Sequence, residues 1–197
     1  TKRYDPISKT SAFVDYTYQV TEGNSVNSGS FYYNALSGEQ EEKRIVPLAW
    51  DQRHILNTNV SVGDPRNWNV GVISKLSSGW PYTPNVPDAN YVPQPNSGRK
   101  PWQWRVDMRV HKNFKIGNFN YLLFMKVYNL LDRRNERYVF NDTGRAGYTY
   151  VYQSTQETQG FKNHYGEAGV HEWSEYQVRP QYYTSPRSIN IGFSVDF

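Results

Sequence analysis

The chain has 197 residues, no cysteine and a formal net charge of +4. The absence of cysteine excludes a disulfide framework and a thiolate metal site. The lysines and arginines are scattered without a basic run, so no nucleic-acid partner is predicted. Mean hydropathy is -0.82, and no stretch approaches the roughly 20 apolar residues of a membrane helix. This low value still permits membrane strands, which distribute their apolar residues by alternation.

Alternation of apolar and polar residues predicts six strands, each at least as long as the roughly nine to eleven residues that a tilted membrane strand needs. In chain order they cover 11–21, 53–62, 68–78, 102–116, 119–131 and 188–197. The cleanest alternation is in 102–116, where Val106, Met108 and Val110 share one face and Arg105, Asp107 and Arg109 share the other. A seventh and an eighth strand are predicted as a hairpin at 146–153 and 173–183, with irregular loop as the alternative.

The connections alternate between short and long. Short turns are predicted at 63–67 and 117–118, and long loops at 22–50, 81–100 and 132–187. Outer-membrane barrels have short periplasmic turns and long extracellular loops. Tryptophan and phenylalanine also gather at both ends of the strands, as in the aromatic girdles of such barrels. A soluble β-sandwich has no comparable reason for that placement.

The terminal strand, 188–197, reads SINIGFSVDF and then the sequence stops. It resembles the recognition signal of outer-membrane barrel proteins, with Asn190 as the polar lead, Gly192 as the glycine, and Val195 and Phe197 as the final apolar pair. That resemblance implies the barrel-assembly machinery as a partner. The alternative is the last strand of a soluble sheet.

Three further segments resemble TonB-dependent outer-membrane receptors: PLAWDQRH at 47–54, SGWPYTP at 78–84 and VYNLLDRRN at 127–135. The resemblance implies an all-β fold in which residues 1–197 are the C-terminal part of a transmembrane β-barrel domain. They would supply six to eight antiparallel strands of a barrel of about 22. It also implies the remainder of the barrel and a plug, a TonB-type energising protein and outer-membrane lipid as partners. The first residue, Thr1, is not a start methionine and no signal peptide follows it, so we expect a start after processing or inside a larger protein.

Two sets of residues are candidates for binding. Charged residues of the barrel lumen would contact a plug or line a solvated interior: Arg105, Asp107, Arg109, Lys115 and Lys126. Aromatic residues of the long loops would contact a ligand or pack among themselves: Tyr32, Tyr33, Tyr82, Tyr91, Tyr148, Tyr150 and Trp173.

No catalytic residue, cofactor or metal ligand is predicted. His164 and His171 lie near several glutamates, but their spacing matches no ligand motif. Phosphate loops and nucleophile elbows are missing from the sequence. The predicted function is therefore energised uptake of a scarce solute by an outer-membrane receptor. The alternatives are a non-transporting component of an outer-membrane complex and a small self-closed barrel acting as adhesin or hydrolase.

Overall fold

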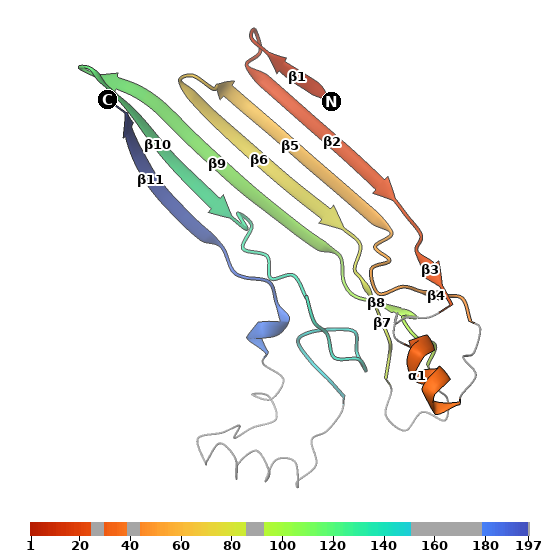
Figure 1. Cartoon of the computed structure of the whole chain (residues 1–197). Coiled ribbons are helices and arrows are strands. Elements are labelled where there is room, and N and C mark those ends of the chain that lie inside the picture. Colours follow the sequence, from red (N-terminus) through yellow and green to blue (C-terminus); the bar gives the residue numbers. More distant parts are fainter. Residues whose placement is uncertain (25–29, 39–43, 86–92, 151–178, 197) are drawn as a thin grey trace, which may run out of the picture.

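The computed structural model describes residues 1–24, 30–38, 44–85, 93–150 and 179–196, and antiparallel sheet dominates them. Seven strands form one sheet in the order β1-β2-β5-β6-β9-β10-β11 (Figure 1). Their bounds are β1 Lys2–Asp5, β2 Thr10–Tyr18, β5 His54–Asp64, β6 Trp68–Ser77, β9 Gln103–Ile116, β10 Phe119–Tyr128 and β11 Ser188–Asp196. The prediction of an antiparallel all-β fold with six to eight strands is confirmed at this level.

The seventh strand of the described sheet lies at the N-terminus. β1 pairs with the beginning of β2. In the predicted hairpin, the described residues 146–150 form no strand, and 180–182 form a single 3₁₀ turn, η1 (Pro180–Tyr182). Tyr183 makes only an isolated bridge to Glu136. The irregular alternative therefore holds for the described part of that segment.

Two residues with positive φ account for the differences between the predicted and observed ends of β10 and β5. β10 stops three residues earlier than predicted because Asn129, at φ 54°, leaves the extended region. β5 instead runs two residues beyond its predicted end, through Gly63 at φ 124°. A β-carbon at Gly63 would lie 2.4 Å from the carbonyl oxygen of Trp68, so only glycine permits this close hairpin.

The pairing register gives the sheet two unlike faces. One row of directly paired residues, read from β2 to β11, is Ala12, Val60, Val72, Met108, Val127 and Ile189. The neighbouring row, shifted by one residue in each strand, is Ser11, Ser61, Gly71, Arg109, Lys126 and Asn190. Because successive side chains point to opposite faces, we call the first row's side the apolar face and the second row's side the polar face.

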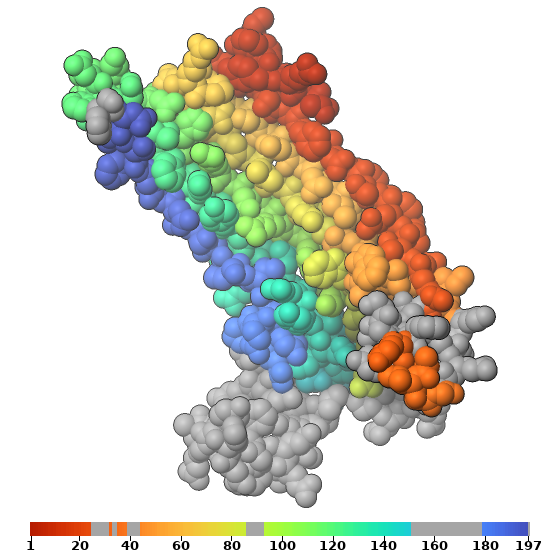
Figure 2. Space-filling model, in the orientation of Figure 1, coloured from red at the N-terminus to blue at the C-terminus, as the bar shows by residue number. Residues whose placement is uncertain are grey.

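The sheet is a single layer. In the space-filling view the strands follow one another in chain-colour order, and no described segment lies over them on the face shown (Figure 2). Large apolar side chains on the apolar face are accordingly exposed, with Ile191 at 70% and Phe193 at 76%. Among the described apolar residues of the seven strands, only Val106 and Val127 are buried, so the sheet has little hydrophobic core of its own.

The two ends of the sheet differ (Figure 1). The turn end carries the short connections 6–9, 65–67 and 117–118, together with the end of β11. The loop end carries the long connections and their small elements: β3 (Glu22–Gly23), α1 (Ser30–Ser37), β4 (Val46–Pro47), β7 (Pro81–Tyr82), β8 (Gly98–Arg99) and η1. The predicted alternation of short and long connections is confirmed, although the loop predicted at 22–50 contains a short helix.

Most buried side chains of the described residues belong to the loop end and not to the sheet. They include apolar Val46, Val139 and Ala146 and polar Asp51, Asn129 and Asn135. Among the described residues, no helix is long and apolar enough to cross a membrane.

Candidate functional site

The polar face gathers all five charged residues predicted to share one side. Arg105, Asp107, Arg109 and Lys115 alternate along β9, and Lys126 of β10 lies directly opposite Arg109. The sequence analysis did not single out Lys75 of β6, which lies directly opposite Arg105 on the same face. Two pairs of like charges are therefore juxtaposed across neighbouring strands.

Asp107 partly neutralises the pair formed by Lys75 and Arg105. Its carboxylate accepts hydrogen bonds from Nε of Arg105 at 2.9 and 3.0 Å. It also accepts one from the backbone N–H of Asn129 at 2.8 Å. These contacts hold the Asp107 carboxylate beside Arg105 and the backbone that follows β10.

Among the hollows that open on the polar side of the described sheet, two bear on the predicted binding residues. One, of about 460 Å³, lies over the middle of the sheet and is lined by residues that include Asn59, Ser61, Asn69, Arg109 and Lys126. The other, of about 470 Å³, lies where the polar face meets the loop end, between residues that include Arg105, Tyr128, Arg137 and Tyr183. Arginine and tyrosine side chains there provide hydrogen-bond donors and aromatic contact area.

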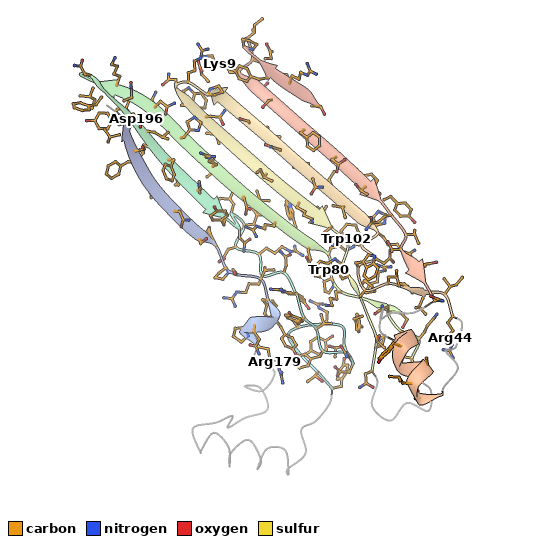
Figure 3. The ribbon with its side chains drawn as sticks, in the orientation of Figure 1. Lys9, Arg44, Trp80, Trp102, Arg179 and Asp196 are labelled. Atoms are coloured by element: carbon orange, nitrogen blue, oxygen red, sulfur yellow. The ribbon has the colours of Figure 1, made fainter. Side chains whose placement is uncertain are left out.

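The apolar face has aromatic residues at both ends. At the loop end, His54 packs between Tyr16 and Trp102, with ring centroids 6.2 and 5.7 Å away. The Tyr16 hydroxyl and Nδ1 of His54 share a hydrogen bond of 2.8 Å. At the turn end, the rings of Phe114 and Tyr121 stack at 5.3 Å. The side-chain view places Trp80 and Trp102 where the strands meet the loops (Figure 3).

A buried carboxylate joins the long connections at the loop end. The Asp51 side chain is fully buried and binds the guanidinium groups of Arg53 and Arg99 and the backbone N–H of Thr21. Burial is the largest single influence and raises the pKa of Asp51. The hydrogen bonds from Thr21, Arg99 and Arg53 together outweigh it, so the pKa of Asp51 lies below its ordinary value. The sequence analysis noted this segment only for its resemblance and missed the cluster.

Two asparagines hold the start of β11 against β9 and β10. The Asn129 side chain donates to the carbonyls of Arg133 and Ser185, at 3.1 and 3.0 Å, and accepts from the N–H of Arg133. The Asn135 side chain pairs with both the N–H and the carbonyl of Trp104, at 2.9 Å each. The segment 127–135 therefore acts as a structural clamp, for which alternation analysis offers no signal.

The terminal strand places Asn190 and Gly192 on the polar face and Val195 on the apolar face. Gly192 faces the ring of Phe124, whose Cζ would lie 2.5 Å from a β-carbon at this position. This glycine thus provides room for an aromatic ring on the neighbouring strand. Phe197 lies outside the described residues.

Tyr82 packs into the loop end. Its ring lies against Gly98 and Gly144, where added β-carbons would approach ring or hydroxyl atoms to within 2.6 and 2.3 Å. Burial, and to a lesser degree the charge of Asp142, raises the pKa of its phenol. The structure therefore gives Tyr82 a packing role, whatever else it contacts.

The other loop aromatics are not gathered into one site. Tyr148 and Tyr150 meet edge to face at 5.7 Å and are exposed. Tyr32 is exposed on α1, and Tyr33 belongs to the same helix. Three of the predicted residues or their side chains lie outside the described residues: Tyr33 (side chain), Tyr91 and Trp173.

No group of three potential metal ligands occurs among the described residues, and His164 and His171 lie outside them. The ring Nε2 of His111 lies 3.2 Å from the carbonyl oxygen of Pro65, at the turn end. Comparisons with known protein families, curated proteins and solved structures find no match to this chain.

Proposed function

We propose that this sheet forms part of the wall of a transmembrane β-barrel in a Gram-negative outer membrane, within a receptor of the TonB-dependent type. The observation that carries the proposal is the apolar face, which continues across six strands. Most of its large apolar side chains are exposed in the described structure, although Val106 and Val127 are buried. Lipid hydrocarbon would cover this face, while the polar face would line a hydrated lumen.

The spacing of the aromatic residues supports the same proposal. Trp104 and Phe114 lie on the apolar face of β9, ten residues apart, which corresponds to about 33 Å of strand. A strand tilt of about 40° reduces this length to about 25 Å, the height of the apolar band of membrane barrels.

The sheet edges support a larger barrel. β1 and β11 are the two ends of the strand order, and they do not pair with each other. In hydrocarbon an unpaired edge is unfavourable, since each unsatisfied backbone group costs several kcal/mol. We infer that further strands complete the barrel, that a plug contacts the polar face, and that a TonB-type protein supplies energy. A small self-closed barrel finds less support, because it needs β1 and β11 to pair.

The proposal is tested by labelling, which the absence of cysteine makes simple. Single cysteines at Val110 and Ile191 report on the apolar face, and those at Arg109 and Asn190 are matched controls one residue away. Nitroxide labels on the full-length protein in bilayers should be accessible to oxygen at the first pair and to water-soluble relaxing agents at the second. Equal accessibility on the two faces contradicts the membrane proposal.

A second measurement separates the receptor from a non-transporting wall component. The full-length receptor should bind the periplasmic domain of a TonB-type protein, and a structural component should not.

A further inference from the structure

Arg109 and Lys126 form a cationic pair without a counter-charge of its own. They lie directly opposite each other on β9 and β10. Neither forms an ion pair with any residue that the structure describes. The Lys126 ammonium lies 5.5 Å from the centre of the Phe124 ring, which is a weak contact for a full charge. Like charges directly opposite on one sheet face are destabilising, so the pair favours an anion between the two side chains.

The surroundings of the pair provide space and hydrogen-bonding groups. The hollow of about 460 Å³ over the middle of the polar face reaches from Arg109 and Lys126 to Asn59, Ser61 and Asn69. Gly71 lies between the cationic pair and the residues Asn59 and Ser61, and it pairs with Ser61 on one side and Arg109 on the other. Nothing approaches its β-carbon position closer than 3.9 Å, so the floor of the hollow is open.

We propose that this hollow, the oxyanion hollow, binds a carboxylate or phosphate group between Arg109 and Lys126. The planar guanidinium donates two parallel hydrogen bonds to such a group, and the ammonium adds a compact charge. The amides of Asn59 and Asn69 supply further donors. Asp107 also lines the hollow, but Arg105 and the N–H of Asn129 engage its carboxylate.

Two sources supply this chemistry: an anionic solute, or an acidic side chain elsewhere in the full-length protein. The inference goes beyond the proposed function, because it requires only the polar face and not the membrane.

The first arm of the test measures thermal unfolding of the full-length protein with added inorganic phosphate or tricarballylate, against sodium chloride at equal ionic strength. Wild type is compared with R109Q, R109K and K126Q. The control is K75Q, which removes an exposed cation that also opposes an arginine but does not line the hollow. If a solute is the source, either anion raises the midpoint of wild type and K75Q. R109Q and K126Q then bind about tenfold more weakly, and R109K lies between.

The second arm uses the same proteins without added anion. If an acidic side chain is the source, R109Q and K126Q unfold at lower temperature than K75Q, and added anions change nothing. If no anion lies between Arg109 and Lys126, the unfolding temperature changes in the opposite direction. Removing either charge then relieves repulsion and raises the midpoint of thermal unfolding. Two results together overturn the proposal. R109Q and K126Q unfold at the same temperature as K75Q or higher, and added anions shift the midpoints of all variants equally or not at all.

Discussion

Arg99 and Asp51, 48 residues apart in sequence, are joined twice: the Arg99 guanidinium binds both the carboxylate and the backbone carbonyl of Asp51. The contact connects the long segment before β5 with the long segment before β9. Because the carboxylate is fully buried, its charge depends on these partners.

Replacing Asp51 by asparagine should lower the free energy of unfolding by about 2 kcal/mol, since two guanidinium groups lose their anion in a buried site. Chemical denaturation of the full-length protein measures the change. Glu22→Gln is the control, because Glu22 pairs with Arg53 at 3.1 Å but is 42% exposed. Its loss should cost less than about 1 kcal/mol. Equal losses of unfolding free energy in the two variants would show that the burial of Asp51 does not strengthen its ion pairs.

The lowered pKa of Asp51 predicts a pH dependence with a definite sign. The folded-state pKa lies below the ordinary value of 3.8, so the ionised carboxylate stabilises the fold fully at pH values above 3.8. That contribution is lost as the pH falls through the lowered folded-state pKa. The difference in unfolding free energy between wild type and D51N should therefore be constant near neutral pH and shrink at pH values below 3.8. A difference that begins to shrink well above this value contradicts the assignment.

The Asn129 clamp can be separated into backbone and side-chain parts. Asn129→Gly keeps the left-handed backbone and removes three side-chain hydrogen bonds. We expect a loss of about 1 to 3 kcal/mol. Asn129→Ala should cost roughly 1 kcal/mol more, because alanine resists this conformation. Hydrogen exchange at the start of β11 should rise in both variants. If N129A is as stable as N129G, backbone strain does not matter here.

The fit between Gly192 and Phe124 predicts that Gly192→Ala destabilises by about 1 to 2 kcal/mol, because the ring must move away from the added methyl group. Gly71→Ala on the same face is the matched control and should be close to neutral, since its β-carbon position is open. Adding Phe124→Leu to G192A should recover part of the loss, as a double-mutant cycle would detect. Additive losses would mean that the two residues do not interact.

Deletion of Phe197 tests the proposed assembly signal. The terminal strand resembles that signal, so we expect less folded, heat-modifiable protein in the outer membrane. Replacement by tyrosine, which keeps an aromatic ring, should retain most of it. Normal assembly together with lost uptake would assign Phe197 to ligand binding instead.

Alternation predicted six of the seven strands and their faces because one face of each is mainly apolar, even where a polar residue such as Lys112 of β9 interrupts it. Met108 and Arg109 could be assigned to opposite faces from sequence alone, and the register agrees. Strand pairing does not follow from alternation, so the position of Lys126 directly opposite Arg109 required the structure. β1 was missed because KRYD carries no apolar periodicity.

The loop end was the least predictable part. Its burial depends on polar side chains such as Asp51, Asn96 and Asn135, which resemble ordinary loop residues in a sequence. Their partners lie far away in the chain, as when Asn96 donates to the carbonyl of Pro47. Only the tertiary arrangement brings such residues together.

The cross-connections of the loop end also determine how this protein can be engineered. Transplanting one long connection alone into another β-sheet protein would separate Asp51 from Arg99 and Pro47 from Asn96. Each transplanted segment would then bury polar groups without their hydrogen-bond partners. The segments 19–53 and 78–102, together with the residues 133–144 that contact the second segment, therefore form one exchangeable module. Chimaeras that move them together should retain their fold, whereas loop-by-loop shuffling should fail.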